Sequence, residues 1–285
     1  MDLKTLLDSL YASRSPRHLA NDPLSFCHRY ASPDDREIAG LIASSLAYGT
    51  VTSILKSLEA VFGPMGPSPR RFVERFEPKA GLRLYDGFKH RFNDGRDLCA
   101  LLLAARTMIE EADTIGEFFT GGLDPLAEDV TEALAAFSAA VLAFDYAPVF
   151  GAQGIPADAY FPFFVPSPLG GSACKRLCMY LRWMVRPADG IDLGVWTGIA
   201  PSQLVIPVDT HIHRIARNLG LTQRRQADWR TAREITAALR RLDPADPVKY
   251  DFALCHLGIS EGCDGTLQPR CTACPVGTIC AAEAA

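Results

Sequence analysis

The chain has 285 residues, of which 48% are hydrophobic and 22% charged, which is the composition of a globular protein with one large domain or two ordinary ones. Its net charge of −4 argues against a uniformly basic polyanion-binding protein. Residues 1–169 carry 15 basic and 22 acidic side chains, whereas residues 170–285 carry 14 and 11, so the second half alone has the balance that permits nucleic-acid binding. No apolar run approaches the roughly 18 residues of a membrane span, and the N-terminus lacks a signal-peptide pattern, so we expect a cytoplasmic protein without membrane contacts.

Apolar side chains recur at helical spacing along almost the whole chain, which predicts an all-α fold. No segment shows a convincing strand alternation. The exception to the helical pattern is residues 145–171, which are rich in Pro, Gly and aromatic residues, and a loop of this length is usually functional or a boundary. We expect helices, in chain order, over residues 3–10, 38–46, 54–62, 98–109, 125–141, 177–184, 212–219, 229–239 and 247–259.

Polar residues and prolines mark the expected helix starts. Ser32 followed by Pro33 is typical of a helix N-terminus, and Asp124 followed by Pro125 repeats the pattern. Asp228 is placed to cap the helix that follows it. Pro247 is expected to open the helix that leads to the C-terminal cysteines.

Four cysteines close the chain, with seven, two and five residues between them: Cys263, Cys271, Cys274 and Cys280. Structural disulfides are rare in the cytosol. A zinc site typically has two C-x-x-C-like pairs, and here only Cys271 and Cys274 form one. Irregular spacing suits a loop around an iron–sulfur cluster with one thiolate per iron, so this reading is favoured while zinc and disulfides stay open. The other cysteines, which we expect in the core, are Cys27, Cys99, Cys174, Cys178 and Cys255.

The segment VIPVDTHIHRIARNLGL (205–221), followed by two helices and the four cysteines, resembles the helix-hairpin-helix (HhH-GPD) DNA glycosylase superfamily. Its endonuclease III and adenine glycosylase branches carry a VDTH-type motif before a C-x6-C-x2-C-x5-C loop that binds a 4Fe–4S cluster. Here the first gap is seven residues rather than six. REIAGLIASSLAYGTVTSIL (36–55) is similar to an early core helix of the superfamily.

The resemblance implies a two-lobed helical fold in three parts. Residues 1–30 are expected to form an N-terminal helix that packs on the C-terminal lobe. Residues 31–220 are expected to form a helical core with the catalytic helices. Residues 221–285 are expected to form C-terminal helices and the iron–sulfur loop.

Asp209 corresponds to the catalytic aspartate of that family. Pro207 and Val208 are expected to be extended, which places Asp209 at a helix N-cap. A carboxylate there would stabilise the positive charge that builds on the sugar when an N-glycosidic bond breaks, although a plain capping role is the alternative. We interpret the adjacent His211 and His213 as packing or phosphate-facing groups, not metal ligands.

The resemblance also implies a lysine nucleophile, whose amine attacks C1′ and forms a Schiff base that permits strand cleavage. GGSACKRLCMYLRWMVR (170–186) offers Lys175, which lies 34 positions before Asp209. The two adjacent glycines depart from the family's G-x-G hairpin, and the long gap is similar to that of an archaeal 8-oxoguanine glycosylase branch. A solvated lysine near a helix start is the alternative.

Base and phosphate contacts are expected close to these two residues. The aromatic stretch YFPFFVPSP (160–168) offers side chains to receive an extruded base, or to fill a domain interface. Arginines on the two catalytic helices are candidates for phosphate contacts. The expected base-binding and DNA-binding residues are Phe161, Phe163, Phe164, Arg176, Arg214 and Arg217.

Together these patterns favour a monomeric base-excision-repair enzyme at the nucleoid, a DNA glycosylase with AP lyase activity on double-stranded DNA that contains a damaged base such as 8-oxoguanine. One alternative is a non-catalytic iron–sulfur protein that binds DNA or senses its structure. Another is a zinc-stabilised helical protein with an unrelated partner.

Overall fold

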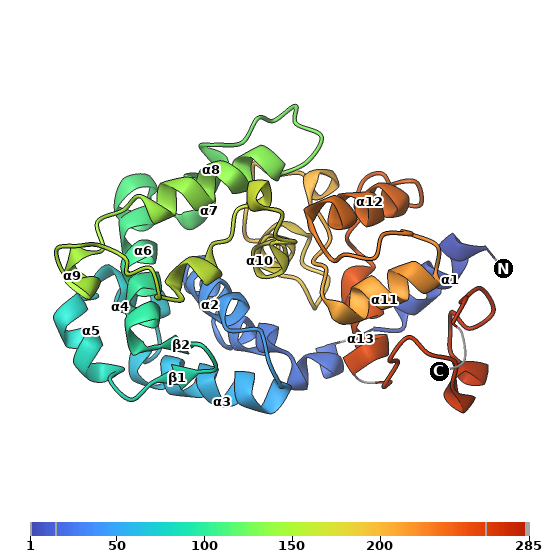
Figure 1. Cartoon of the computed structure of the whole chain (residues 1–285), viewed down its shortest axis with the longest axis horizontal. Coiled ribbons are helices and arrows are strands. Elements are labelled where there is room, and N and C mark those ends of the chain that lie inside the picture. The colour runs from blue at the N-terminus through green and yellow to red at the C-terminus, as the bar shows by residue number, and fades with distance from the viewer. Residues whose placement is uncertain (1, 15, 260, 283–285) are drawn as a thin grey trace.

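The computed structural model describes residues 2–14, 16–259 and 261–282, and these residues form an all-helical architecture, as predicted (Figure 1). Short 3-10 helices connect the longer ones, and those used below are η4 (Phe161–Phe164) and η5 (Pro168–Gly170). The α-helices are α1 (Leu3–Ala12), α2 (Pro33–Ser45), α3 (Val51–Phe62), α4 (Pro69–Glu74), α5 (Pro78–Leu84), α6 (Gly95–Ala112), α7 (Ile115–Thr120), α8 (Thr131–Leu142), α9 (Ala147–Phe150), α10 (Lys175–Val185), α11 (Thr210–Asn218), α12 (Trp229–Arg240) and α13 (Asp251–Ile259).

Two of the predicted helix starts are wrong. Residues after Asp124 form a turn instead of a helix, and Leu126 is 92% exposed. The helix α8 begins at Thr131 because Asp129, not Asp124, accepts the Thr131 N–H at 2.9 Å. Likewise residues 247–250 form a turn, and α13 begins at Asp251. The caps predicted at Asp209 and Asp228 are confirmed.

A small hairpin was not expected from the sequence. The strand β1 (Lys89–His90) pairs antiparallel with β2 (Asn93–Asp94). Strands of two residues are too short to show an alternating pattern, so the sequence carried no signal for them. The segment 145–171 is also not one loop, since it contains α9, η4 and η5.

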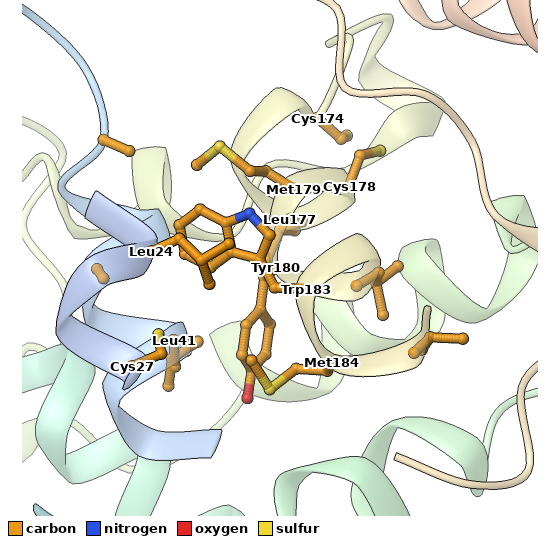
Figure 2. Packing of buried hydrophobic residues seen from close by; sticks show 14 of the residues in the cluster. Leu24, Cys27, Leu41, Cys174, Leu177, Cys178, Met179, Tyr180, Trp183 and Met184 are labelled. Atoms are coloured by element: carbon orange, nitrogen blue, oxygen red, sulfur yellow. The ribbon is translucent and has the colours of Figure 1, made fainter. Parts of the chain in front are cut away.

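The helix α10 runs through the middle of the molecule and packs against α2 (Figure 1). Gly40 permits this close approach, because a Cβ on it would lie 2.6 Å from the Met184 methyl group. Figure 2 shows Tyr180 and Met184 side by side on the buried face of α10, and the Tyr180 hydroxyl donates to the Glu37 backbone oxygen at 3.1 Å. The core positions expected for four cysteines are confirmed, whereas Cys255 is half-buried: Cys27, Cys99, Cys174 and Cys178.

The two ends of the molecule carry different elements (Figure 1). One end holds α4, α5, α9 and the hairpin. The other holds α11, α13 and residues 263–281, which carry the four C-terminal cysteines and are called the cysteine segment below. The helix α1 packs on α13, where Asp8 accepts from the Tyr250 hydroxyl at 2.8 Å and pairs with Lys249 at 3.1 Å. The described part of the chain contains no helix that is both long and apolar enough to cross a membrane.

Candidate functional site

Lys175 is the first residue of α10, and its side chain is half-buried. Its Nζ donates to the backbone oxygen of Ala47, just after α2, at 3.3 Å. Cys174 before it has a left-handed backbone with φ of 47°, and Gly171 has φ of 80°. The turn that leads into α10 is therefore tight, and it follows the 3-10 helix η5 instead of an α-helix.

Asp209 caps α11, as its position in the sequence predicts. Its Oδ1 accepts the backbone N–H groups of His211 and Ile212, both at 2.9 Å. The other carboxylate oxygen, Oδ2, has no hydrogen-bond donor in the described part of the chain. The extended residues Pro207 and Val208 are buried, so the chain enters the helix from the core and presents Asp209 at a half-buried position.

The charges of Lys175 and Asp209 both act on a residue of a third helix. Asp251, at the start of α13, is 3% exposed and forms an ion pair with Arg182. Burial raises the pKa of Asp251 to about 6, Arg182 and Lys175 oppose the rise, and the Asp209 charge adds to it. Asp251 therefore lies within electrostatic range of both Lys175 and Asp209.

The adjacent histidines have structural contacts. A Cβ on Gly258 of α13 would lie 2.7 Å from Nδ1 of His211, so the imidazole is packed against that helix. The Nε2 atom of His213 is 2.9 Å from the backbone oxygen of Arg224. These contacts agree with the packing role expected for both residues.

The cysteine segment is attached to the far end of α11. The side-chain amide of Asn218 donates to the backbone oxygen of Gly265 at 2.8 Å, and the backbone oxygen of Asn218 accepts from the Ala281 N–H at 2.9 Å. The Arg214 guanidinium donates to the backbone oxygen of Asp264 at 3.3 Å. One helix thus carries Asp209 at its N-terminus and holds both ends of the cysteine segment at its C-terminus.

The four C-terminal cysteines line one cavity of about 40 Å³, and three of them also line an adjoining cavity of about 200 Å³. Burial raises the pKa of the Cys274 thiol. The Cys271 sulfur accepts the Gln268 N–H at 3.3 Å. Within residues 2–14, 16–259 and 261–282, no three His, Cys, Asp or Glu side chains are placed to hold a metal ion. The thiols are gathered around one cavity without ligand geometry.

The predicted DNA contacts divide into buried and exposed residues. Arg176 is 7% exposed, and its guanidinium donates to the backbone oxygens of Ser45 and Phe163, which does not suit a phosphate contact. Phe161 and Phe164 are fully buried core residues, which does not suit a base contact. The side chains that do reach solvent are Phe163, Arg214 and Arg217.

Sequence reasoning missed the ion network that joins α10 to α13. Arg182 pairs with Asp192 at 3.1 Å and with Asp251, and Arg186 pairs with Asp192 and with Asp246. These arginines share the buried face of α10, where charged residues are rare unless paired. The apolar residues at helical spacing around Arg182 and Arg186 indicated a buried position for both, and this was the signal from which the ion network could have been inferred.

The chain belongs to a family described as "Protein of unknown function (DUF2400)", whose profile matches residues 22–260. The matched range includes Lys175, Asp209 and Asp251, and it ends before Cys263. No curated protein matches the chain.

Proposed function

We propose that this protein is a DNA glycosylase with AP lyase activity of the helix-hairpin-helix type, acting on a damaged base such as 8-oxoguanine in double-stranded DNA. The observation that carries the proposal is that Lys175 and Asp209 each stand at a helix start with a half-buried side chain. They lie 34 residues apart in the sequence, yet both are within electrostatic range of the buried Asp251. An amine and a carboxylate that flank one sugar carbon are the groups needed for Schiff-base glycosidic cleavage.

In this mechanism the neutral amine of Lys175 attacks C1′ of the damaged nucleotide. The bond between C1′ and the base nitrogen breaks, and the base leaves with the electron pair and takes up a proton. The C1′–O4′ bond then breaks, O4′ takes up the remaining proton of the amine, and an imine forms between Nζ and C1′. Asp209 stabilises the positive charge on the sugar, and its Oδ2 has no donor among the described residues to compete for its charge.

Borohydride trapping tests this step. We expect wild-type protein to be frozen covalently onto lesion-containing duplex, because borohydride reduces the imine, and the Lys175→Gln variant to form no adduct. The matched control is Lys56→Gln, which changes an exposed lysine on α3. Base release by wild type without trapping would identify water as the nucleophile and contradict the lyase assignment.

A non-catalytic iron–sulfur protein that binds DNA is the second candidate. The net charge of −4 and the absence of the G-x-G hairpin ahead of Lys175 favour it. A panel of lesion duplexes, assayed for base release with and without alkaline treatment, separates the two. Binding without release on any lesion would support this candidate and exclude the glycosylase.

The cofactor proposed for the C-terminal segment is a 4Fe–4S cluster, held by Cys263, Cys271, Cys274 and Cys280. What supports this group is the donor set, since the four thiols are soft ligands that line one cavity and the Gln268 N–H already donates to one sulfur. The cluster would cross-link the two ends of the cysteine segment and so fix its conformation. Because Asn218 bonds both ends of this segment, a fixed segment would also hold α11, and with it Asp209, in place.

We expect anaerobically purified protein to be brown and to contain iron and acid-labile sulfide. Cys274→Ser should lose most of both, because one of the four thiolates is missing. The control is Cys99→Ala, which changes a buried core cysteine and should retain the iron. Stoichiometric zinc without sulfide would contradict the cluster and support a zinc site.

A further inference from the structure

A patch of aromatic rings reaches solvent beside Lys175. We call Tyr48, Phe92, Tyr160 and Phe163 the aromatic surface, of which Phe92 is 50% exposed, Tyr160 47% and Phe163 43%, while Tyr48 is half-buried. They come from three separate segments: the turn after α2, the hairpin turn and the stretch at η4. Phe92 and Tyr160 are stacked, with ring centroids 5.4 Å apart and an interplanar angle of 19°. Phe163 meets Tyr48 edge-on at 5.3 Å.

Positive charges accompany the rings. The exposed guanidinium of Arg91 lies 6.0 Å from the Tyr48 ring centroid and 5.6 Å from that of Phe92, which is cation–π distance. Arg91 has a left-handed backbone with φ of 53°, and its stem packs on Gly49, whose φ is 103°. Lys89 is also exposed, and its Nζ donates to the backbone oxygen of Phe92 at 3.3 Å. Among the described residues, no acidic side chain forms an ion pair with Lys89 or Arg91. These two charges are thus available to an anionic ligand.

Fully buried polar groups hold the aromatic surface in place. The Tyr48 hydroxyl donates to Oδ1 of Asn93 at 2.5 Å, and the Asn93 amide donates to the Tyr160 backbone oxygen at 3.1 Å and to Asp97 at 3.1 Å. The Nε2 atom of His90 is 3.0 Å from the Tyr48 backbone oxygen. Burying such groups is costly unless they are bonded. Here the hydrogen bonds of Asn93 and His90 fix Tyr48 and the backbone of Tyr160, whose rings lie at the surface. A network that served only the stability of the core would not need to fix surface rings.

The aromatic surface continues to the start of α10. Lys175 donates to Ala47, the residue before Tyr48. The Arg176 guanidinium lies 3.7 Å from the Phe163 ring centroid and 5.1 Å from that of Tyr48, so it supports both rings from the interior. The rings and the proposed nucleophile therefore share one short stretch of surface.

We propose that the aromatic surface binds an unpaired nucleobase of the DNA, which stacks on the Phe92–Tyr160 pair while Arg91 and Lys89 contact the adjacent phosphates. The inference rests on the proposed function for the identity of the ligand as DNA. Flat rings with fixed cations match a base and its phosphate. An apolar peptide or a lipid would be better matched by aliphatic side chains, and exposed leucines occur elsewhere, at Leu126 and Leu169.

The test uses duplexes with one unpaired 2-aminopurine and fully paired duplexes of the same sequence, with affinity measured by anisotropy and stacking by 2-aminopurine fluorescence. Phe92→Ala and Tyr160→Ala should each weaken binding of the unpaired duplex about fivefold or more and leave the paired duplex within about twofold. Phe92→Leu keeps apolar bulk without a ring and should behave as Phe92→Ala. The matched control is Leu169→Ala, a side chain 72% exposed outside the aromatic surface.

The outcomes separate this inference from the proposed function. Equal binding of paired and unpaired duplexes, or unchanged affinity in the Phe92 and Tyr160 variants, overturns the inference even if Lys175 trapping succeeds. Quenched 2-aminopurine fluorescence that depends on Phe92 supports it even if no lesion is released, because the readout needs no catalysis. A protein that binds no oligonucleotide overturns both proposals.

Discussion

Asp209→Asn should reduce base release by about a hundredfold or more, the usual cost of removing one charge-stabilising group from a reaction centre, while fold and DNA affinity are retained. An asparagine oxygen can still accept the two backbone N–H groups that Asp209 Oδ1 accepts, so the cap on α11 survives. What disappears is the negative charge beside the sugar. Single-turnover base release measures the first effect and thermal unfolding the second.

Asp228→Asn is the matched control for this variant. Asp228 also caps a helix, accepting from Thr231 N–H at 2.8 Å, but it pairs with Arg224 and belongs to the separate helix α12. Base release should be unchanged. Full activity in Asp209→Asn would remove Asp209 from the reaction and leave the DNA-binding alternative.

Arg182→Met should destabilise the protein by about 3–5 kcal/mol, the cost of leaving a buried charge without its partner. Arg182 is 4% exposed and joins α10 to Asp192 and Asp251. Asp192 keeps Arg186 as a partner, whereas Asp251 forms its ion pair with Arg182. The free energy of unfolding from urea titrations measures the loss.

The loss should depend on pH. Burial already raises the pKa of Asp251 to about 6, above its value in an unfolded chain, and removal of Arg182 raises it further. A carboxyl whose folded pKa is raised contributes stability when protonated, and that stability is lost as pH rises through the folded pKa. The difference between wild type and variant should therefore be larger at pH 8 than at pH 5.

Arg29→Met is the control, because Arg29 forms an exposed ion pair with Glu59 on the surface. Its cost should stay below about 1 kcal/mol. A cost for Arg182→Met in that same small range, or one that does not change with pH, would show that the network contributes little to the position of α13.

The connection between the cysteine segment and Asp209 also has a physical reason. The helix α11 is a rigid element of nine residues, and Asn218 at its end holds both Gly265 and Ala281. Disorder in the cysteine segment would release these contacts and loosen the helix that presents Asp209. A structural cofactor there would act on the site through position, without touching the substrate.

Local patterns determined most of the longer helices, whereas the short helices α4, α5, α7 and α9 were not predicted. Apolar spacing and capping residues predicted α1, α2, α3, α6, α10, α11 and α12, and they predicted Asp209 as a cap, because these signals act within one or two turns of the chain. The starts of α8 and α13 were misplaced, since a proline after an aspartate is equally suited to a turn, and a neighbouring carboxylate decided between them.

Which side chains meet depends on how the helices pack. From local patterns alone we predicted an all-helical chain with a lysine at one helix start, an aspartate at another and four cysteines near its C-terminus. Burial separated Arg176, Phe161 and Phe164 from solvent, and contacts between distant segments joined three segments in the aromatic surface. Helical periodicity states which face of a helix is apolar, but the partner of that face depends on how all the helices pack together.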